Sequence, residues 1–395
     1  MRVLFLTCHL PYPPVSGGRL RELELLRRLG PEVVVHLCAV SKTFEQDRAA
    51  ADRLHGSCES VAVFEASPGA DDLPAQLRRH CSPGATAYVR SLLDEVDLVH
   101  VEGFYLLHHV PDPAPVPLLL VGQNVEYSLW AQRVGIGEGG PQQREAFREF
   151  RETRAAELRA WRRADCCAAV TAEDRAAILR VAPELDVRIV PDGVDHLARP
   201  PAQSREPRPE LVFVGNFAYH PNADAALWFC REILPRVRER VPEVRALLVG
   251  NAPPPEVLDL GCEHVEVTGR VHSVEGYLDR AAVAVSPLRV GGGIKVKMLE
   301  ALSRGKAIVS TSVGVQGLGE DAHRSIEVAD DAGPFAAACA RLLLDHEERK
   351  RLERRALAFA ATLPTWDNAA ASLLDCYREL TVSRTLADAE GAELR

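Results

Sequence analysis

The sequence predicts an α/β protein built from two doubly wound, Rossmann-like parallel-sheet domains. The chain has 395 residues, which is long for one hydrophobic core and typical of two domains. Short apolar runs alternate with segments of helical periodicity in both halves, as parallel strands with crossover helices require. A proline-rich, charged stretch without periodicity, residues 196–210, separates the two series.

Composition excludes several classes of protein. The net charge of −9 argues against a nucleic-acid binder that works through a broad basic surface. The ten cysteines form no Cys-x-x-Cys pair, so we expect no zinc site and no other metal. The N-terminal apolar run breaks at Pro11 and suits a buried strand better than a signal peptide. We therefore expect a cytoplasmic protein.

The first half contains seven strand candidates and two clear helices. Residues 19–29 have helical spacing and end at Gly30, and residues 142–163 form a long helix rich in Arg and Glu. The second helix is explained either by a solvated face with ion pairs or by contact with an acceptor or membrane. The predicted strands of this half are residues 3–6, 33–40, 61–64, 97–101, 117–121, 167–171 and 188–190.

After residue 210 the alternation restarts. A helix is expected at 223–240, and a final amphipathic helix follows near the C-terminus. The predicted strands are residues 211–215, 244–250, 265–269, 282–288 and 307–311. The predicted organisation is an N-terminal domain at 1–198, a linker at 199–208, a C-terminal domain at 209–364, a helix at 365–382 that crosses back to the N-terminal domain, and a polar, frayed tail at 383–395.

The segment GGGIKVKMLEALSRGKAIVST, residues 291–311, carries the strongest chemical signal. Its glycines let the backbone approach an anion closely, and a helix N-terminus attracts phosphate. Lys295 and Lys297 are two residues apart and cannot face one point from a helix, so we expect Lys297 to meet a phosphate and Lys295 to lie outward. Glu300 suits the vicinal hydroxyls of a ribose. On spacing alone, an ordinary strand–glycine–helix connection explains the segment equally well.

A second glycine motif favours the nucleotide interpretation. SGGRL, residues 16–20, follows the first strand and opens the first helix. Two such loops at corresponding ends of two sheets are harder to explain as simple connections, because ligands of doubly wound sheets bind at the carboxyl ends of the strands. No GxGxxG or GxxxxGK[ST] motif is present, so neither a dinucleotide fingerprint nor a Walker loop is supported.

Taken together, these segments resemble the retaining glycosyltransferases of family 4, which have the GT-B fold of two domains facing across a cleft. The resemblance rests on PYPPVSGGRLREL near the N-terminus, QNVEYSLWAQR at 123–133, IVPDGVD at 189–195, FVGNFAYHPNADAALWFCREILP at 213–235 and, most specifically, residues 267–311. These stretches occur in both halves and in the family's order.

The resemblance implies a donor site. Glu300 matches the second glutamate of the family's Glu-x7-Glu motif, which holds the donor ribose. Gly17 and Gly18 would line the diphosphate and sugar, with Arg19 nearby, and the loop around Arg270 would pass the base. The backbone of the GGGIK loop would meet the diphosphate and sugar through Gly292, Gly293, Ile294 and Lys295.

Three departures from the family pattern change this picture. Gly292 stands where the first motif glutamate is expected, and Asn216 and Pro221 stand where Arg and Lys commonly bind the diphosphate. Gln123 replaces the histidine of the family's His-Asn-x-Glu sequence. We hypothesise that Lys297, helped by Lys295, supplies the missing positive charge. We therefore expect Lys297 and Glu300 to be the catalytic residues and Asn216 to remain in the donor-binding site. The alternative is a degenerate site without turnover.

Acceptor-side candidates come from the first half. His100 and Glu102 lie at a predicted strand end, and Asn124 and Glu126 follow the next strand. A strand-end histidine that is merely hydrogen-bonded explains His100 equally well. The acceptor could be a sugar, a lipid-linked saccharide or a small molecule, which leaves open peripheral contact with the inner membrane face.

The expected function is therefore glycosyl transfer in polysaccharide or glycoconjugate biosynthesis. The predicted reaction moves a sugar, with retention, from a nucleotide-diphosphate sugar co-substrate to an acceptor hydroxyl, with no cofactor. The alternatives are a GT-B sugar-nucleotide epimerase and a non-catalytic nucleotide-sugar-binding partner of another transferase.

Overall fold

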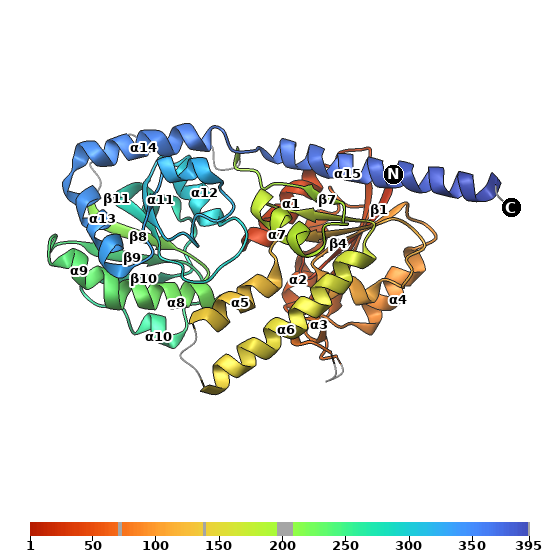
Figure 1. Ribbon diagram of the computed structural model, residues 1–395, viewed down its shortest axis with the longest axis horizontal. Helices are drawn as coiled ribbons and strands as arrows, with labels where there is room; N and C mark the ends of the chain where they lie inside the picture. Colours follow the sequence, from red (N-terminus) through yellow and green to blue (C-terminus); the bar gives the residue numbers. More distant parts are fainter. Residues whose placement is uncertain (70–72, 137–139, 196–207, 394–395) are drawn as a thin grey trace. The chain divides into compact units, whose positions relative to one another are not determined.

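The computed structural model describes residues 1–69, 73–136, 140–195 and 208–393 (Figure 1). The chain divides into two compact units, the first formed by Met1–Gly193 with Thr365–Arg395 and the second by Val194–Pro364. The predicted linker at 199–208 lies outside the described residues except for Arg208, which begins a strand. None of the helices in the described ranges is long and apolar enough to cross a membrane.

The first unit contains a parallel sheet of seven strands in the order β3-β2-β1-β4-β5-β6-β7. The chain order reverses between β1 and β4, which is the switch point of a doubly wound sheet. The strands are β1 (Arg2–Thr7), β2 (Val34–Ser41), β3 (Ser60–Glu65), β4 (Leu98–Glu102), β5 (Leu118–Gly122), β6 (Cys166–Ala169) and β7 (Val187–Ile189).

Helices cover both faces of this sheet because the strand side chains alternate between two cores. Val3 and Phe5 of β1 pack in one core with α1 and the final helix, and Leu4 and Leu6 pack in the other with α4 and α6. The helices of this unit are α1 (Gly17–Arg28), α2 (Phe44–Ala50), α3 (Ala75–Arg78), α4 (Pro83–Leu92), α5 (Glu126–Ile136), α6 (Gly140–Arg163), α7 (Ala172–Val181) and α15 (Trp366–Glu393).

The C-terminal segment differs from the prediction of a frayed tail. α15 continues without a break through residue 393, beyond the predicted helix end at 382. Trp366, Leu373 and Tyr377 anchor its first half in the core shared with α1, while no side chain beyond residue 382 is described. The polar composition of 383–395 indicated fraying, but a helix already nucleated by packing extends at low cost, because only nucleation is expensive.

The second unit contains a parallel sheet of six strands in the order β10-β9-β8-β11-β12-β13. Its switch point lies between β8 and β11, the counterpart of the first unit's β1 and β4. The strands are β8 (Arg208–Val214), β9 (Arg245–Val249), β10 (Val265–Gly269), β11 (Ala281–Ser286), β12 (Ala307–Ser310) and β13 (Glu327–Val328).

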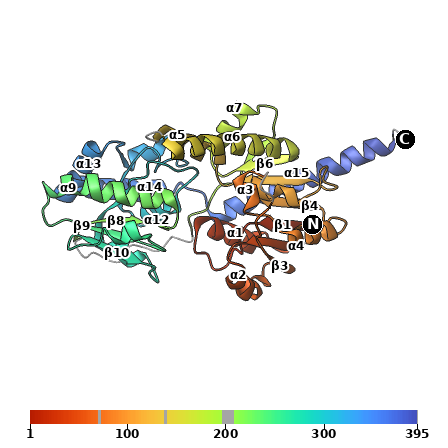
Figure 2. The ribbon, with the colours of Figure 1, turned by 90° about the horizontal axis from the view of Figure 1, so that it is seen from below.

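Two cores also flank this sheet. Leu211 and Phe213 face the core with α8, α9 and α13, and Val212 faces the core with α12. Figure 2 shows α9 and α13 together on one side of these strands. The helices are α8 (His220–Trp228), α9 (Leu234–Arg238), α10 (Pro255–Leu258), α11 (Glu275–Arg280), α12 (Val296–Ser303), α13 (Ala332–Leu344) and α14 (His346–Ala360).

The helix predicted over 223–240 is interrupted. A π-helical turn, Phe229–Ile233, separates α8 from α9. Pro235 lies in the first turn of α9 and lacks the N–H that a regular α-helical ladder would use, so the hydrogen-bond pattern shifts in the turn before it.

Candidate functional site

The glycine loop of the second unit lies at the carboxyl edge of its sheet, beside the switch point. The loop follows β11 and leads into α12, whose N-cap is Lys295. Gly293 has a φ of +60°, a left-handed conformation that favours glycine. The first N–H groups of α12 therefore lie two residues after a run of three glycines, an arrangement suited to an anion.

Lys297 reaches from α12 toward β8 and the start of α8. Its Nζ donates a hydrogen bond to Asn222 Oδ1 and lies 4.6 Å from the centroid of the Phe213 ring. Asn222 in turn donates to the Asn216 carbonyl over 2.8 Å and follows Pro221 directly. The ammonium group thus occupies the neighbourhood of the two positions where the sequence lacks the usual cations.

Burial gives this lysine an unusual charge state. Burial, together with the charge of Lys295, lowers the pKa of Lys297 to about 7, against the opposing charge of Glu300. Burial also raises the pKa of Glu300 to about 7, against the charge of Lys297. Both groups therefore titrate near neutrality, and an arriving diphosphate would favour the ammonium form of Lys297.

The prediction that Lys295 lies outward, which was based on helical spacing, is wrong. Its side chain is 7% exposed and its Nζ donates to the Gly293 carbonyl over 2.8 Å and to Gln316 Oε1 over 3.3 Å. The backbone of Lys295 is extended, with φ −103° and ψ 107°, because this residue is the N-cap. The helical spacing of side chains applies only inside a helix, so it could not place the side chain of the N-cap residue. The hydrogen bond from Lys295 to the Gly293 carbonyl instead stabilises the glycine loop.

The remaining donor-side candidates of this unit lie near the same edge. Asn216 follows β8 and forms a turn in which its Oδ1 accepts from the Ala218 N–H over 3.2 Å. Gly292 and Ile294 lie in the glycine loop and are partly buried, and Arg270 is exposed directly after β10.

The glycine motif of the first unit begins α1. Ser16 is the N-cap and accepts from the Arg19 N–H, and Gly17 is the first helical residue. A Cβ on Gly18 would lie 2.7 Å from Gln123 Oε1, so the side-chain amide of Gln123 packs closely against this glycine. Arg19 forms a double hydrogen bond with the Asp47 carboxylate and donates to the Leu10 carbonyl. The arginine expected near a diphosphate is thus engaged in fastening α1 to α2.

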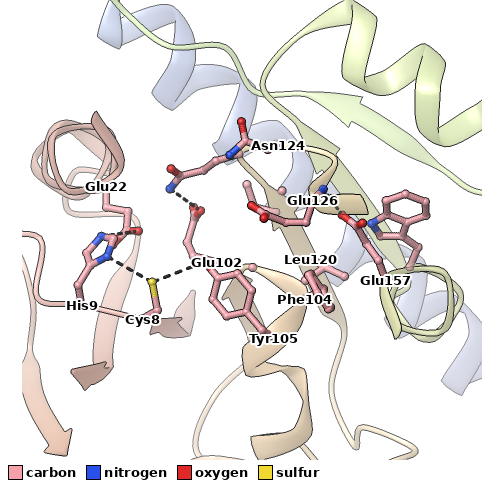
Figure 3. A pocket seen from close by; sticks show the side chains of 15 residues that line it. Cys8, His9, Glu22, Glu102, Phe104, Tyr105, Leu120, Asn124, Glu126 and Glu157 are labelled. Carbon is pink, nitrogen blue, oxygen red and sulfur yellow. Dashed lines mark hydrogen bonds and ion pairs between the residues drawn. The ribbon is translucent and has the colours of Figure 1, made fainter. Parts of the chain in front are cut away.

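A cavity of about 80 Å³ opens at the β1–β4 switch point of the first unit (Figure 3). Three predicted acceptor-side residues, Glu102, Asn124 and Glu126, line it together with Gln123. Burial raises the pKa of Glu126 to about 7. Glu102 is held ionised: burial opposes its charge, but the His100 hydrogen bond and the charges of His100 and Arg21 lower its pKa.

His100 lies behind this cavity and does not line it. The imidazole is fully buried, with Nδ1 2.7 Å from the Tyr377 hydroxyl and Nε2 3.0 Å from Glu102 Oε1. It also stacks on Phe5. With both ring nitrogens engaged, His100 can only orient Glu102, which matches the alternative of a hydrogen-bonded strand histidine.

Sequence reasoning missed three residues on the opposite wall of this cavity. Cys8 and His9 directly follow β1, and Glu22 lies on α1 (Figure 3). Cys8 Sγ is 3.3 Å from His9 Nδ1, and His9 Nε2 is 3.1 Å from Glu22 Oε1. The signal that the sequence offered was the adjacent pair Cys8 and His9, a nucleophile and a base, directly after the first predicted strand.

Glu157 of α6 stabilises the start of α5 and makes the stability of this unit pH-dependent. Its carboxylate accepts from the backbone N–H groups of Glu126 and Tyr127 over 2.9 and 3.0 Å. Burial, reinforced by the charge of Glu126, raises the pKa of Glu157 to about 8.

We expect the contribution of Glu157 to the free energy of unfolding to fall as the pH rises from 5 to 8, because the folded chain keeps the Glu157 proton that the unfolded chain has lost. Glu157→Gln should flatten this fall by about 1–3 kcal/mol in denaturant unfolding measured across that range. Exposed Glu145 on the same helix provides the control, Glu145→Gln. An unchanged pH profile in Glu157→Gln would contradict the assignment.

Comparisons with known proteins agree with this geometry. Residues 208–345 match the family of glycosyl transferases group 1. This segment contains the strands of the second unit's sheet and its glycine loop. A curated protein from Klebsiella pneumoniae, "Uncharacterized 44.6 kDa protein in cps region", is 24% identical over 135 residues. That match covers 32% of this chain and 35% of the relative, so this chain spans about a third of the relative's length.

Solved structures resemble the whole chain. Sucrose-phosphate synthase from Thermosynechococcus elongatus has a TM-score of 0.75 at 17% identity, covering 97% of this chain and 100% of that one. Anabaena Alr3699/HepE, solved in complex with UDP and glucose, has a TM-score of 0.64 at 17% identity, covering 96% and 100%. Trehalose 6-phosphate synthase from Burkholderia multivorans has a TM-score of 0.63 at 12% identity, covering 98% of each chain. These likenesses confirm the predicted GT-B fold.

Proposed function

We propose that the chain is a glycosyltransferase that moves a sugar from a nucleotide-diphosphate sugar to an acceptor hydroxyl, with retention and without a metal ion, in the cytoplasm. The observation that carries the proposal is Lys297, an ammonium group held between Asn222 and Phe213 at the β8–β11 switch point, with Glu300 one turn later. The family match over 208–345 covers the same elements.

The proposed chemistry needs no protein nucleophile. In this scheme the acceptor hydroxyl attacks the face that the diphosphate leaves, and the protein positions the reactants and stabilises the charge on the leaving group. Lys297 and the N–H groups at the start of α12 supply that stabilisation, and Glu300 holds the ribose. Loss of one such charged contact costs about 10²–10³ in rate.

We assign donor binding to the second unit and acceptor binding to the first. Glu102, Asn124 and Glu126 offer carboxylate and amide groups suited to sugar hydroxyls. UDP is the first nucleotide to test, because the Anabaena protein with this fold has been solved in complex with it.

The test is calorimetric binding of UDP, GDP, dTDP and ADP to the purified chain, followed by release of labelled sugar from the matching donor. We expect one nucleotide to bind and Glu300→Gln to weaken it about ten- to hundredfold, as loss of hydrogen bonds to a charged group does. The matched control, Glu320→Gln, removes an exposed carboxylate of the same unit.

The outcomes separate the alternatives. Donor cleavage supports the transferase, and tight binding without any cleavage or transfer would favour a non-catalytic binding partner. Interconversion of the donor sugar would indicate an epimerase. Failure of all four nucleotides to bind would overturn the proposal.

A further inference from the structure

Cys8, His9 and Glu22 form a nucleophile–base–carboxylate chain that the proposed transfer does not use. Cys8 Sγ lies 3.3 Å from His9 Nδ1, and His9 Nε2 lies 3.1 Å from Glu22 Oε1. Thr7 completes the chain, since its hydroxyl donates to Glu22 Oε2 over 2.7 Å. Glu22 is fully buried, which fixes the imidazole from behind. This order of groups is the arrangement that activates a nucleophile.

The free end of this chain is the sulfur atom. Both ring nitrogens of His9 lie against protein groups, Nδ1 beside Cys8 Sγ and Nε2 beside the Glu22 carboxylate. Cys8 is half-buried and lines the 80 Å³ cavity, where Tyr105 Oη lies 3.6 Å from the sulfur on the other side. Such a cavity admits water and solutes of similar size.

Cys8 differs from the other nine cysteines, all of which lie in the described residues. Cys262, in the second unit, is exposed. Burial raises the pKa of the other eight thiols, Cys38, Cys58, Cys81, Cys166, Cys167, Cys230, Cys339 and Cys376. These eight should be inert in the folded chain, because thiolates are the reactive form.

The charges around Cys8 lower the pKa of its thiol, in contrast to the raised pKa values of those eight thiols. Burial alone would raise the pKa of its thiol, but the charge of His9 and hydrogen bonds from His80 and His9 lower it well below the usual value. Burial would lower the pKa of His9, but the charges of Glu22 and Cys8 raise it well above its usual value. The titratable groups that interact with Cys8 are His9, Glu22, Lys42, His80, Tyr105 and Glu126.

We propose that Cys8 is a modification site, a thiolate oriented by His9 and Glu22 that reacts with hydrogen peroxide entering the cavity. The proposal rests on this cluster and its opening, and does not depend on the glycosyltransferase assignment. The ligand class is a small, uncharged oxidant, which suits a cavity that already contains several carboxylates.

The reaction balances with the groups present. The Cys8 sulfur attacks one peroxide oxygen, so that an S–O bond forms and the O–O bond breaks. Sulfur is oxidised by two electrons to sulfenic acid, and the peroxide is reduced. The departing hydroxide takes the proton of the His9 imidazolium and leaves as water, and the His9 imidazole becomes neutral.

The test is mass spectrometry of the full, native chain after brief iodoacetamide treatment at pH 5.5–8, with peptides quantified separately for Cys8 and Cys262. A free cysteine loses rate about tenfold per pH unit below its pKa of about 8.5. We expect Cys8 to retain its rate within about threefold from pH 8 to pH 6 and to react at least about tenfold faster than Cys262 at pH 6. Peroxide should then produce a dimedone adduct at Cys8.

Two variants isolate the cause. His9→Asn removes the cation and should restore a steep loss of rate below pH 8, whereas Cys262→Ser should leave the Cys8 profile unchanged. Equal or slower alkylation of Cys8 relative to Cys262 at pH 6, in the unmodified wild-type chain, would overturn the proposal. So would a dimedone adduct at Cys262 but not at Cys8.

Discussion

Replacing Lys297 with methionine is expected to weaken binding of the nucleotide about ten- to hundredfold and, at the same time, to stabilise the folded chain. The loss of affinity follows from removing a charged donor to the diphosphate, and hydrogen bonds to charged groups contribute about 1.5–3 kcal/mol. The gain in stability follows from the same burial that positions the ammonium group. Methionine keeps the length of the side chain and can pack against Phe213 without a charge.

The pH dependence identifies the origin of the gain. Burial lowers the pKa of Lys297 to about 7 in the folded chain, while in the unfolded chain it titrates near 10.5. Between these values the unfolded chain binds one proton more at this lysine, so the contribution of Lys297 to the free energy of unfolding rises with pH from 7 upward. We expect Lys297→Met to be more stable by about 1–3 kcal/mol at pH 6, with the difference shrinking as the pH rises toward 9.

Denaturant unfolding at pH 6, 7.5 and 9, together with calorimetric titration of the nucleotide, measures both effects. Lys350→Met is the matched control, because Lys350 is exposed on α14 and should change neither quantity. Unaltered nucleotide affinity in Lys297→Met would remove Lys297 from the donor site. A loss of both affinity and stability would show that the lysine is structural.

The fold could be predicted from the sequence because its signals are local. Runs such as LVFVG and VRALLVG have the length and apolar character of buried parallel strands, and their alternation with helical segments predicts the fold class. The glycine loop before α12 was readable for the same reason, since Gly293 and Lys297 are close in sequence.

The contacts that complete the sites are not local, and the sequence could not supply them. Cys8, Glu22 and Glu102 meet because β1 and β4 are neighbours in the sheet, although they are separated by two other strands in the chain. Arg19 pairs with Asp47, although 28 residues and the strand β2 separate them in the chain. The order of strands in the sheet, and not the periodicity of the sequence, determines which of these residues come into contact.

Gly250→Ala is expected to destabilise the second unit by at least about 3 kcal/mol, the range of severe backbone clashes. Gly250 follows β9 and has a φ of +149°, which L residues rarely adopt. A Cβ there would lie 1.8 Å from the Gly215 carbonyl oxygen, which follows β8. The Gly215 carbonyl belongs to the backbone, so it cannot rotate away from the added Cβ as a side chain could.

The clash would act directly at the carboxyl edge that holds the donor candidates. The Gly215 N–H bonds to the Val249 carbonyl over 3.0 Å, and the Phe217 N–H bonds to the Asn251 carbonyl over 2.9 Å. Separating these two backbones displaces Asn216, whose carbonyl accepts from Asn222, the partner of Lys297. Hydrogen exchange should therefore accelerate in β8 and β9 before it does in the first unit.

Gly276→Ala is the control for this substitution. Gly276 lies in α11, and an added Cβ would meet nothing within 4 Å, so alanine should be neutral or stabilise the helix by about 0.5–1 kcal/mol. Denaturant unfolding of the two variants should thus differ in sign as well as size. If Gly250→Ala unfolds within about 0.5 kcal/mol of the wild type, as ordinary surface substitutions do, the close approach of the two strand ends is wrong.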